Sequence, residues 1–300
     1  MLPLFDLHCD TLTASYEGNY SLLSSPLHIS LDKCVKFSPY FQIMAIWTND
    51  ALSSEAGFKR YKKTLEYAKN QGFEFSTKLK NNKENMFFLA IEDLRIIGND
   101  LSRIDILYQD GVRFITPVWK DISQIGGAWN TKLGISRFGK RALEGAIKMG
   151  ITIDVSHCSE CGFYDILELC YNANAIPVAT HSCSYSIRAH KRNLTDEQFL
   201  NLVRLGSCVG ISLAPEHLSS NGIASIDDIL RHIDHYLSLG GENNISLGCD
   251  FDGVSSLPME ISSIFDLDKL YYRLLKCYDE AITNKIFCHN FLDLSKRILN

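Results

Sequence analysis

The chain has 300 residues, of which 46% are hydrophobic and 22% charged, and its formal net charge is −5. A chain of this size can bury a substantial core. The mild acidity argues against a nucleic-acid partner, for which a basic patch is expected. The ten cysteines are scattered, and several fall within apolar patterns, so we expect free thiols in a reducing, cytoplasmic compartment.

The N-terminal segment MLPLFDLHCDTL lacks the basic stretch and the long apolar stretch of a signal peptide. No apolar run reaches the ~18 residues that a membrane span needs. We therefore expect a protein without a membrane partner.

Short apolar segments, often β-branched, alternate along the chain with longer amphipathic ones. The apolar segments predict strands that are covered on both faces. They are residues 4–7, 41–47, 87–91, 112–116, 151–155, 176–180, 208–213 and 245–248. The amphipathic segments predict helices at residues 55–70, 138–149, 159–173, 195–205, 225–239, 265–282 and 284–299. Ser159 could cap one of these helices, and Thr195 with Gln198 has the spacing of a capping box.

Alternating strands and helices predict βαβ units and a parallel sheet. Eight strands within 300 residues fit a closed (β/α)₈ barrel, with residues 1–300 as a single catalytic domain. An open, doubly wound sheet is the alternative. The barrel is favoured because all its strands end at one mouth, where residues from the first and last strands can meet.

Six acidic or imidazole side chains each follow the end of a predicted strand. They are His8, Asp10, Glu92, His157, His181 and Asp250. Because these strand ends would share the mouth of the barrel, the pattern predicts a metal centre there.

His8 and Asp10 are two residues apart, so both side chains would lie on the same face of a strand and could bind an ion such as Zn²⁺. The alternative is a turn residue beside a hydrogen-bonded histidine. Glu92 follows five apolar residues, and a buried carboxylate must be paired or bound. It could bridge two ions, or it could form an ion pair with Arg95 or Arg113.

His157 and His181 end consecutive predicted strands and would suit a second ion, although a lone histidine in such a place is usually structural. Two ions ~3.5–4 Å apart can hold a bridging hydroxide and polarise a carbonyl. Asp250 would be a sixth ligand or the proton carrier that such a reaction needs. The alternative for the Asp250 and Asp252 segment is a simple turn, which suits Asp252 better.

The chain resembles the membrane dipeptidase (renal dipeptidase) family of zinc metallopeptidases, especially its bacterial members. The segments that carry the resemblance occur in the family's order: DLHCDTL, AIED, GVRFITPVW, MGITIDVSHCSECGF, PVATHSCSYSIRAHKRNLTDEQ and SLGCDFDGV. The resemblance implies a (β/α)₈ barrel with two zinc ions. In the family pattern, His8 and Asp10 hold one ion, His157 and His181 hold the other, and Glu92 bridges them. Asp250 would be the catalytic acid and base, and Arg192, otherwise readable as a surface charge, would bind substrate.

The chain also departs from the family pattern. Trp119 stands where animal members have a histidine that polarises the substrate carbonyl, so its indole could contact the substrate instead. Asp93 and Leu94 replace glycines and could narrow the mouth, and Ala214 replaces a tyrosine that contacts substrate. Because the metal ligands of the family pattern are complete while the substrate contacts differ, the sequence favours an active hydrolase with altered specificity over an inactive one.

Three further groups of residues are open to interpretation. Cys158 and Cys161 form a C-x-x-C motif at a helix start, for which a redox role is the weaker interpretation. His232 and His235 would be surface histidines on an outer helix. His190 and His217 could line the pocket, which the sequence does not decide.

The sequence therefore predicts a dipeptidase with two Zn²⁺ ions that acts on small dipeptides and, as the resemblance implies, tolerates a D-residue at the C-terminal position. The alternatives are another binuclear amidohydrolase, acting on N-acyl amino acids or cyclic amides, and an inactive metal-binding relative. Aromatic residues of the C-terminal helices, Tyr271, Tyr272 and Phe291, are a hint of a homodimer.

Overall fold

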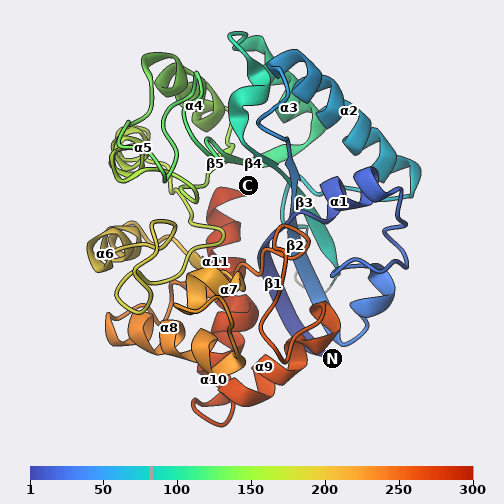
Figure 1. The fold of residues 1–300 in the computed structure, drawn as a ribbon, viewed down its shortest axis with the longest axis vertical. Coiled ribbons are helices and arrows are strands. Elements are labelled where there is room, and N and C mark those ends of the chain that lie inside the picture. Colours follow the sequence, from blue (N-terminus) through green and yellow to red (C-terminus); the bar gives the residue numbers. More distant parts are fainter. Residues whose placement is uncertain (81–83, 300) are drawn as a thin grey trace.

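The protein is described here by a computed structural model that covers residues 1–80 and 84–299. Seven parallel strands form one curved sheet in the order β5-β4-β3-β2-β1-β7-β6 (Figure 1). The strands are β1 (Leu2–Cys9), β2 (Phe37–Trp47), β3 (Met86–Glu92), β4 (Val112–Thr116), β5 (Thr152–Ile153), β6 (Val209–Ile211) and β7 (Ile245–Leu247). Seven of the eight predicted strands are therefore present, although β5, β6 and β7 are shorter than predicted.

The predicted strand at residues 176–180 is not a regular strand, but it closes the barrel. Val178 forms a bridge to Asp154, next to β5, and Ala179 forms a bridge to Val209 in β6. The Val178 N–H donates to the carbonyl of Ile153 at 2.9 Å, so backbone hydrogen bonds continue across this gap. On either side of these bridges the ladder is interrupted, because Pro177 lacks an N–H group and the Thr180 N–H donates to the Asp154 side chain. The predicted closed barrel is confirmed, although the strand predicted at residues 176–180 forms only isolated bridges to its neighbours.

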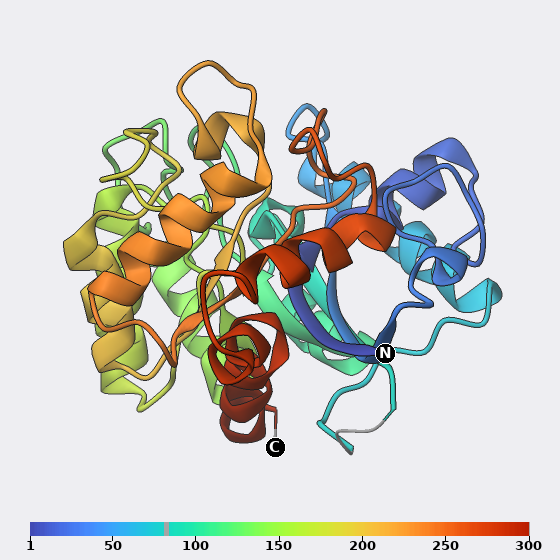
Figure 2. The same cartoon turned by 90° about the horizontal axis from the view of Figure 1, so that it is seen from below.

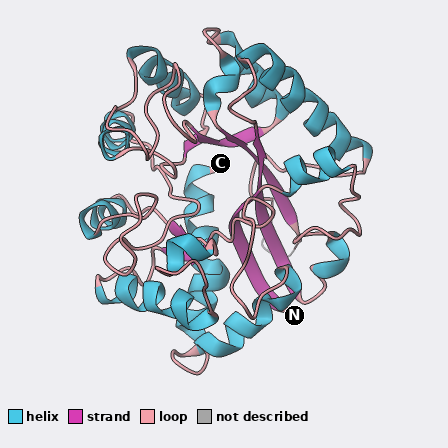
Figure 3. Ribbon diagram, in the orientation of Figure 1, coloured by secondary structure: helices cyan, strands magenta, loops and turns pink. Residues whose placement is uncertain are grey.

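Helices surround the sheet, as Figure 3 shows in cyan. They are α1 (Thr11–Gly18), α2 (Ser54–Asn70), α3 (Ser102–Asp110), α4 (Arg137–Lys148), α5 (Glu160–Asn172), α6 (Asp196–Arg204), α7 (Pro215–Leu218), α8 (Ile226–Ser238), α9 (Leu267–Leu274), α10 (Glu280–Asn284) and α11 (Asn290–Ile298). Ser159 caps α5 by accepting from the Gly162 N–H, and Thr195 and Gln198 form the predicted capping box of α6.

The C-terminal segment differs most from its prediction. The helix predicted over residues 265–282 ends at Leu274, and α10 begins only after Asp279, whose side chain caps it by accepting from the Ile282 N–H. A π-helical turn, Lys285–His289, then leads into α11.

Helix α11 closes the end of the barrel that is opposite the loops carrying the site (Figure 2). Phe5 and Phe114 lie inside the barrel, and the Phe291 ring packs against them at centroid distances of 4.7 and 6.2 Å. Since Phe291 and Tyr271 are buried, the predicted aromatic surface is wrong for two of its three residues, and only Tyr272 is exposed.

The prediction that His232 of helix α8 lies on the surface is wrong. His232 is fully buried and not on the surface, because its Nδ1 accepts from the Ser184 N–H and its Nε2 faces the carbonyl of Leu218.

Among the described residues, no helix has the length and apolar character needed to cross a membrane.

Candidate metal centre

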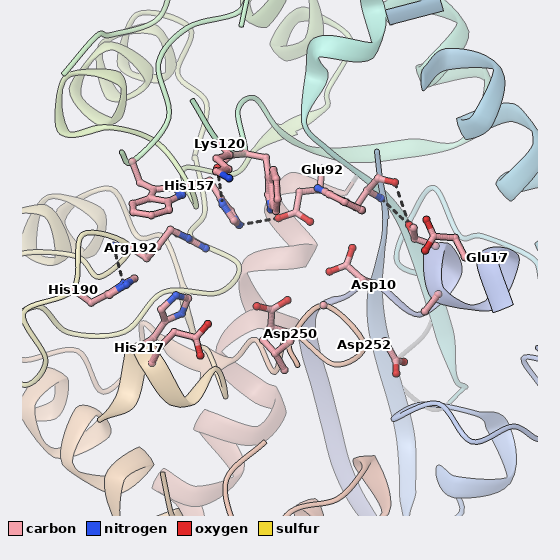
Figure 4. Close-up of a pocket in the computed structure, with 18 residues that line it drawn as sticks. Asp10, Glu17, Glu92, Lys120, His157, His190, Arg192, His217, Asp250 and Asp252 are labelled. Atoms are coloured by element: carbon pink, nitrogen blue, oxygen red, sulfur yellow. Dashed lines mark hydrogen bonds and ion pairs between the residues drawn. The ribbon is translucent and has the colours of Figure 1, made fainter. Parts of the chain in front are cut away.

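The six side chains predicted from the strand ends lie together at one end of the barrel. Their ligand atoms form three overlapping groups, each within 4.8 Å: His8, Asp10 and Glu92; Glu92, His157 and His181; and His8, His181 and Asp250. Figure 4 shows that Asp10, Glu92 and Asp250 point toward a common centre. The barrel therefore brings together residues that are up to 242 positions apart (from His8 to Asp250).

An irregularity in β1 directs its last residues into the mouth. Phe5 and Leu7 pack inside the barrel, whereas Cys9 packs in the layer between the sheet and its helices. The pairing with β2 changes register between Asp6 and Cys9, and such a shift changes the face on which the following side chains lie. His8 therefore faces the mouth, with its Nε2 at 3.5 Å from Asp10 Oδ2, and the predicted common face of His8 and Asp10 is confirmed.

Glu92 lies between two groups of imidazoles, with His8 on one side and His157 and His181 on the other. Its Oε2 is 3.6 Å from His8 Nε2, while its Oε1 is 2.8 Å from His157 Nε2 and 3.6 Å from His181 Nε2. One carboxylate oxygen thus faces each group. Arg95 bonds to Asp93 and not to Glu92, and the Arg113 guanidinium donates to backbone carbonyls, so neither arginine forms the alternative ion pair.

The hydrogen bonds of the imidazoles leave their Nε2 lone pairs directed into the site. His157 Nδ1 lies 3.0 Å from the Trp119 carbonyl, which can only accept, so Nδ1 carries the proton. His181 Nδ1 lies 2.8 Å from the Thr180 hydroxyl. The Nε2 atoms of His157 and His181 are 2.9 Å apart. Two unprotonated nitrogens so close together need a shared cation or proton between them.

Unpartnered polar atoms also indicate that a cation belongs here. His8 Nε2 and Asp10 Oδ1 are buried without a hydrogen-bond partner among the described residues. Buried polar atoms are normally satisfied, so such a pair in one place indicates a ligand. Three imidazoles with carboxylates form a donor set suited to Zn²⁺ and similar ions.

The pKa values of two carboxyl groups in the site, Glu92 and Asp250, are shifted in opposite directions. Burial by itself would raise the pKa of Glu92, but the neighbouring His8 and His157 hold it well below its ordinary value. Burial raises the pKa of Asp250 well above the ordinary value, and Asp10 and Glu92 add to this effect while His8 and Arg192 oppose it. Glu92 is therefore held as an anion, whereas Asp250 binds a proton readily.

Two of these residues have an unusual backbone conformation. Asp250 and His157 have φ values of +59° and +65°, in the left-handed region that non-glycine residues rarely adopt. Such conformations cost about 1 kcal/mol or more and concentrate at functional sites. Asp252 also has positive φ, and it accepts from the His28 N–H and the Thr11 hydroxyl, which supports the interpretation that Asp252 is a turn residue.

The candidate metal centre lies at the base of a pocket of about 390 Å³. Arg192 lines this pocket, is 6% exposed, and has a buried Nη2 without a hydrogen-bond partner among the described residues. Trp119 lines it as well and packs edge-on against Trp47. His190 and His217, which the sequence left undecided, are both in the lining, on the same wall as Arg192 (Figure 4).

The departures from the family pattern affect the pocket less than expected. Asp93 is buried and bonds to Arg95, and Leu94 is buried in the core, so neither lines or narrows the mouth. Ala214 is buried at the start of α7 and is not in the pocket lining either. Of the four positions Asp93, Leu94, Trp119 and Ala214, Trp119 is the one that lines the pocket.

The sequence did not reveal several residues that shape the site. Trp47, Trp129 and Lys120 line the pocket. Thr180 contacts ring nitrogens from behind, and Asp154 accepts from the Thr180 hydroxyl. Asp154 lies three residues before the candidate ligand His157, and Thr180 lies one residue before His181. Polar side chains at such positions of an apolar strand are the signal that could have identified them.

The Cys158 thiol of the C-x-x-C motif is not activated. Burial raises the pKa of Cys158 well above its ordinary value, and Cys158 and Cys161 are free. A low thiol pKa is the property that a redox cysteine requires, so a redox role is not supported.

Comparison with known proteins identifies the family. The model of the membrane dipeptidase family, peptidase family M19, matches residues 1–299. An uncharacterised protein encoded in the pqqA 5′ region of Klebsiella pneumoniae is 31% identical over 214 residues, which are 67% of this chain and 76% of that protein. An uncharacterised dipeptidase of Schizosaccharomyces pombe is 26% identical over 66% of this chain and 49% of its own length.

Solved structures agree on the fold. A dipeptidase of family M19 superposes with a TM-score of 0.90 at 23% identity, over 99% of both chains. A metallopeptidase from Rhodobacter sphaeroides, bound to a phosphinate mimic of the dipeptide L-Ala-D-Ala, also gives a TM-score of 0.90, at 22% identity over 99% of both chains. Because the family model covers nearly the whole sequence, this chain belongs to the membrane dipeptidase family, peptidase family M19, and is a hydrolase of the metallopeptidase type.

Proposed function

We propose that this chain is a binuclear zinc dipeptidase, with residues 1–300 acting as a single catalytic domain. The observation that carries the proposal is the position of Glu92, whose two carboxylate oxygens face different imidazole groups. His8 and Asp10 would hold one ion with Glu92 Oε2, and His157 and His181 would hold the other with Oε1. Zinc ions bound there would supply polarisation of the peptide carbonyl and activation of water.

Asp250 is the residue we assign to proton transfer. Its Oδ1 lies 3.9 Å from His8 Nε2, at the edge of the ligand cluster, and its side chain lines the pocket. A carboxyl group in this place can take a proton from water and deliver it to the leaving amine. Burial favours its protonated form, which suits the delivery step.

Arg192 is assigned to the terminal carboxylate of the dipeptide. The guanidinium is buried, lines the pocket and has an unsatisfied donor, and its planar fork matches a carboxylate. Trp119, on the wall beside His157, would contact the substrate through its ring.

A D-residue at the C-terminal position would be tolerated because a charged group, and not a shaped side-chain pocket, anchors that end. The D-Ala-containing mimic bound by the Rhodobacter sphaeroides protein supports this proposal.

We also propose a cytoplasmic location and a homodimer. The ten cysteines are free thiols, which suits the reducing conditions of the cytoplasm. A homodimer stays a prediction, tested by sedimentation of the purified protein.

The test of the function is hydrolysis of a defined panel by the zinc-loaded protein. The panel contains L,L- and L,D-dipeptides, their C-terminal amides, N-acetyl amino acids and cyclic amides such as hydantoins. We expect turnover of free dipeptides of both series, loss of activity with a chelator, and recovery with Zn²⁺. Turnover of only the acylated or cyclic compounds would contradict the dipeptidase assignment, and no turnover despite two bound ions would indicate a binding protein.

A further inference from the structure

Behind the ligand cluster, a buried carboxylate makes a complete set of hydrogen bonds. Asp154 is 1% exposed. Its Oδ1 accepts from the backbone N–H groups of Ser156 and Thr180, both at 2.9 Å. Its Oδ2 accepts from the hydroxyls of Thr116 at 2.7 Å and Thr180 at 2.5 Å. Four donors fill the four acceptor positions of a carboxylate, so Asp154 is held rigidly as an acceptor.

This carboxylate fixes the direction of the Thr180 hydroxyl hydrogen. A hydroxyl has one donor hydrogen and two acceptor lone pairs. Because Asp154 takes the hydrogen, both lone pairs of Thr180 Oγ1 are available to accept. His181 Nδ1 lies 2.8 Å from this oxygen and His8 Nδ1 lies 3.4 Å from it. The hydroxyl therefore faces two ring nitrogens and can only accept from them.

The consequence is a fixed tautomer for two imidazoles. With the proton on Nδ1, the Nε2 lone pairs of His181 and His8 face Glu92 and the pocket. His181 belongs to the group with His157, and His8 belongs to the group with Asp10. The two rings lie close together, with centroids 3.9 Å apart and planes inclined by 35°, so one hydroxyl can serve both.

We propose that Asp154 and Thr180 form a positioning pair that sets the tautomer and orientation of one imidazole in each metal-binding group. This inference rests on the proposed binuclear site. Neither residue would touch the substrate, so the pair acts through the two histidines. Loss of the pair weakens the binding of both cations, and partners of this kind typically change metal affinity 10- to 100-fold.

The barrel offers a matched control in Thr116. Its hydroxyl donates to the same Oδ2 of Asp154 at a similar distance, but it contacts no imidazole among the described residues. Thr180→Val and Thr116→Val therefore each remove one hydroxyl donor from Asp154, and only the first removes the acceptor of His181 and His8. Thr180→Ser keeps that acceptor.

The test is a zinc titration of each metal-free protein in competition with a chromophoric chelator. We expect Thr180→Val to bind both Zn²⁺ ions 10- to 100-fold more weakly than the wild type, and Thr116→Val and Thr180→Ser to stay within about threefold. Equal losses in Thr180→Val and Thr116→Val, or an equally large loss in Thr180→Ser, would overturn the proposal.

A second variant gives a readout that does not depend on metal. In Asp154→Asn the amide NH₂ would donate to Thr180, whose hydroxyl would then donate to His181 Nδ1 and move the ring proton to Nε2. Ring ¹⁵N chemical shifts of the metal-free protein should show this exchange, and an unchanged Nδ1–H tautomer would contradict the pair. If Thr180→Val does not fold, this variant carries the test. If the wild type itself binds fewer than two ions, the proposed function fails, and not only the positioning pair.

Discussion

The side chains of the site differ in what each contributes to chemistry. Glu92 and the imidazoles face one another at distances that suit shared cations, whereas Asp250 and Arg192 line the space above them. Ligands and reacting groups can therefore be separated by substitution, because one set should change metal content and the other should not.

Substitution of Asp250 tests that separation. Asp250→Asn removes the proton carrier but keeps the size of the side chain, so kcat should fall by roughly 10²- to 10⁴-fold. The zinc content after dialysis should stay at two ions per chain. Loss of an ion together with activity would show that Asp250 is a ligand.

Substitution of Arg192 tests how the substrate is held. Arg192→Ala removes a charge-assisted hydrogen bond to the terminal carboxylate, so kcat/KM for a dipeptide should fall roughly 10- to 100-fold. The C-terminal amide of the same dipeptide lacks that charge, and its hydrolysis should change little. An equal loss for acid and amide would contradict the assigned role.

At the scale of elements, the strand ends were predictable and their surroundings were not. An apolar run followed by an acidic or imidazole residue is visible in the sequence at β1, β3 and β7. The register shift in β1 is not visible, because it depends on pairing with β2. The burial of His232 was also not predictable, since its partner Ser184 comes from a loop and its partner Leu218 from helix α7.

The backbone at Thr180 approaches Gly210 and Gly248 so closely that neither position has room for a side chain. A Cβ on Gly248 would lie 1.7 Å from the Thr180 carbonyl oxygen, and one on Gly210 would lie 2.1 Å from it. Gly248→Ala should therefore destabilise the fold by at least about 2 kcal/mol. Gly145, in the interior of α4, has no atom within 4 Å of an added Cβ. Gly145→Ala should stabilise by roughly 0.5–1 kcal/mol, and denaturant unfolding of both variants measures the contrast.

The buried histidine of α8 makes stability depend on pH. Burial lowers the pKa of His232 to about 4 from an ordinary value near 6.5. The unfolded chain therefore binds this proton more readily, so the contribution of His232 is present above pH ~6.5 and is lost as the pH falls toward 4.

Comparison with a variant isolates this contribution. Between pH 7.5 and 4.5, the wild type should lose up to about 2–3 kcal/mol more unfolding free energy than His232→Asn. Both proteins are measured in chelator, so that the site histidines contribute equally. Parallel pH profiles would contradict the assignment of a buried neutral imidazole.

At the scale of the whole molecule, barrel closure brings the first strand and the last strand of the chain to one site. β1 lies between β2 and β7, so His8 and Asp250 are neighbours in space. The alternation of elements in the sequence predicted this closure. The reduction of residues 176–180 to isolated bridges, and the packing of Phe291 under the barrel, depend on tertiary contacts that the sequence pattern does not encode.

The central claim is that Glu92 lies between two cations. Anomalous diffraction at the zinc absorption edge, from crystals of the zinc-loaded protein, tests it most directly. The account predicts two peaks, one beside each carboxylate oxygen of Glu92, with His8 and Asp10 at one peak and His157 and His181 at the other. A single peak, or two peaks out of bonding reach of Glu92, would contradict it.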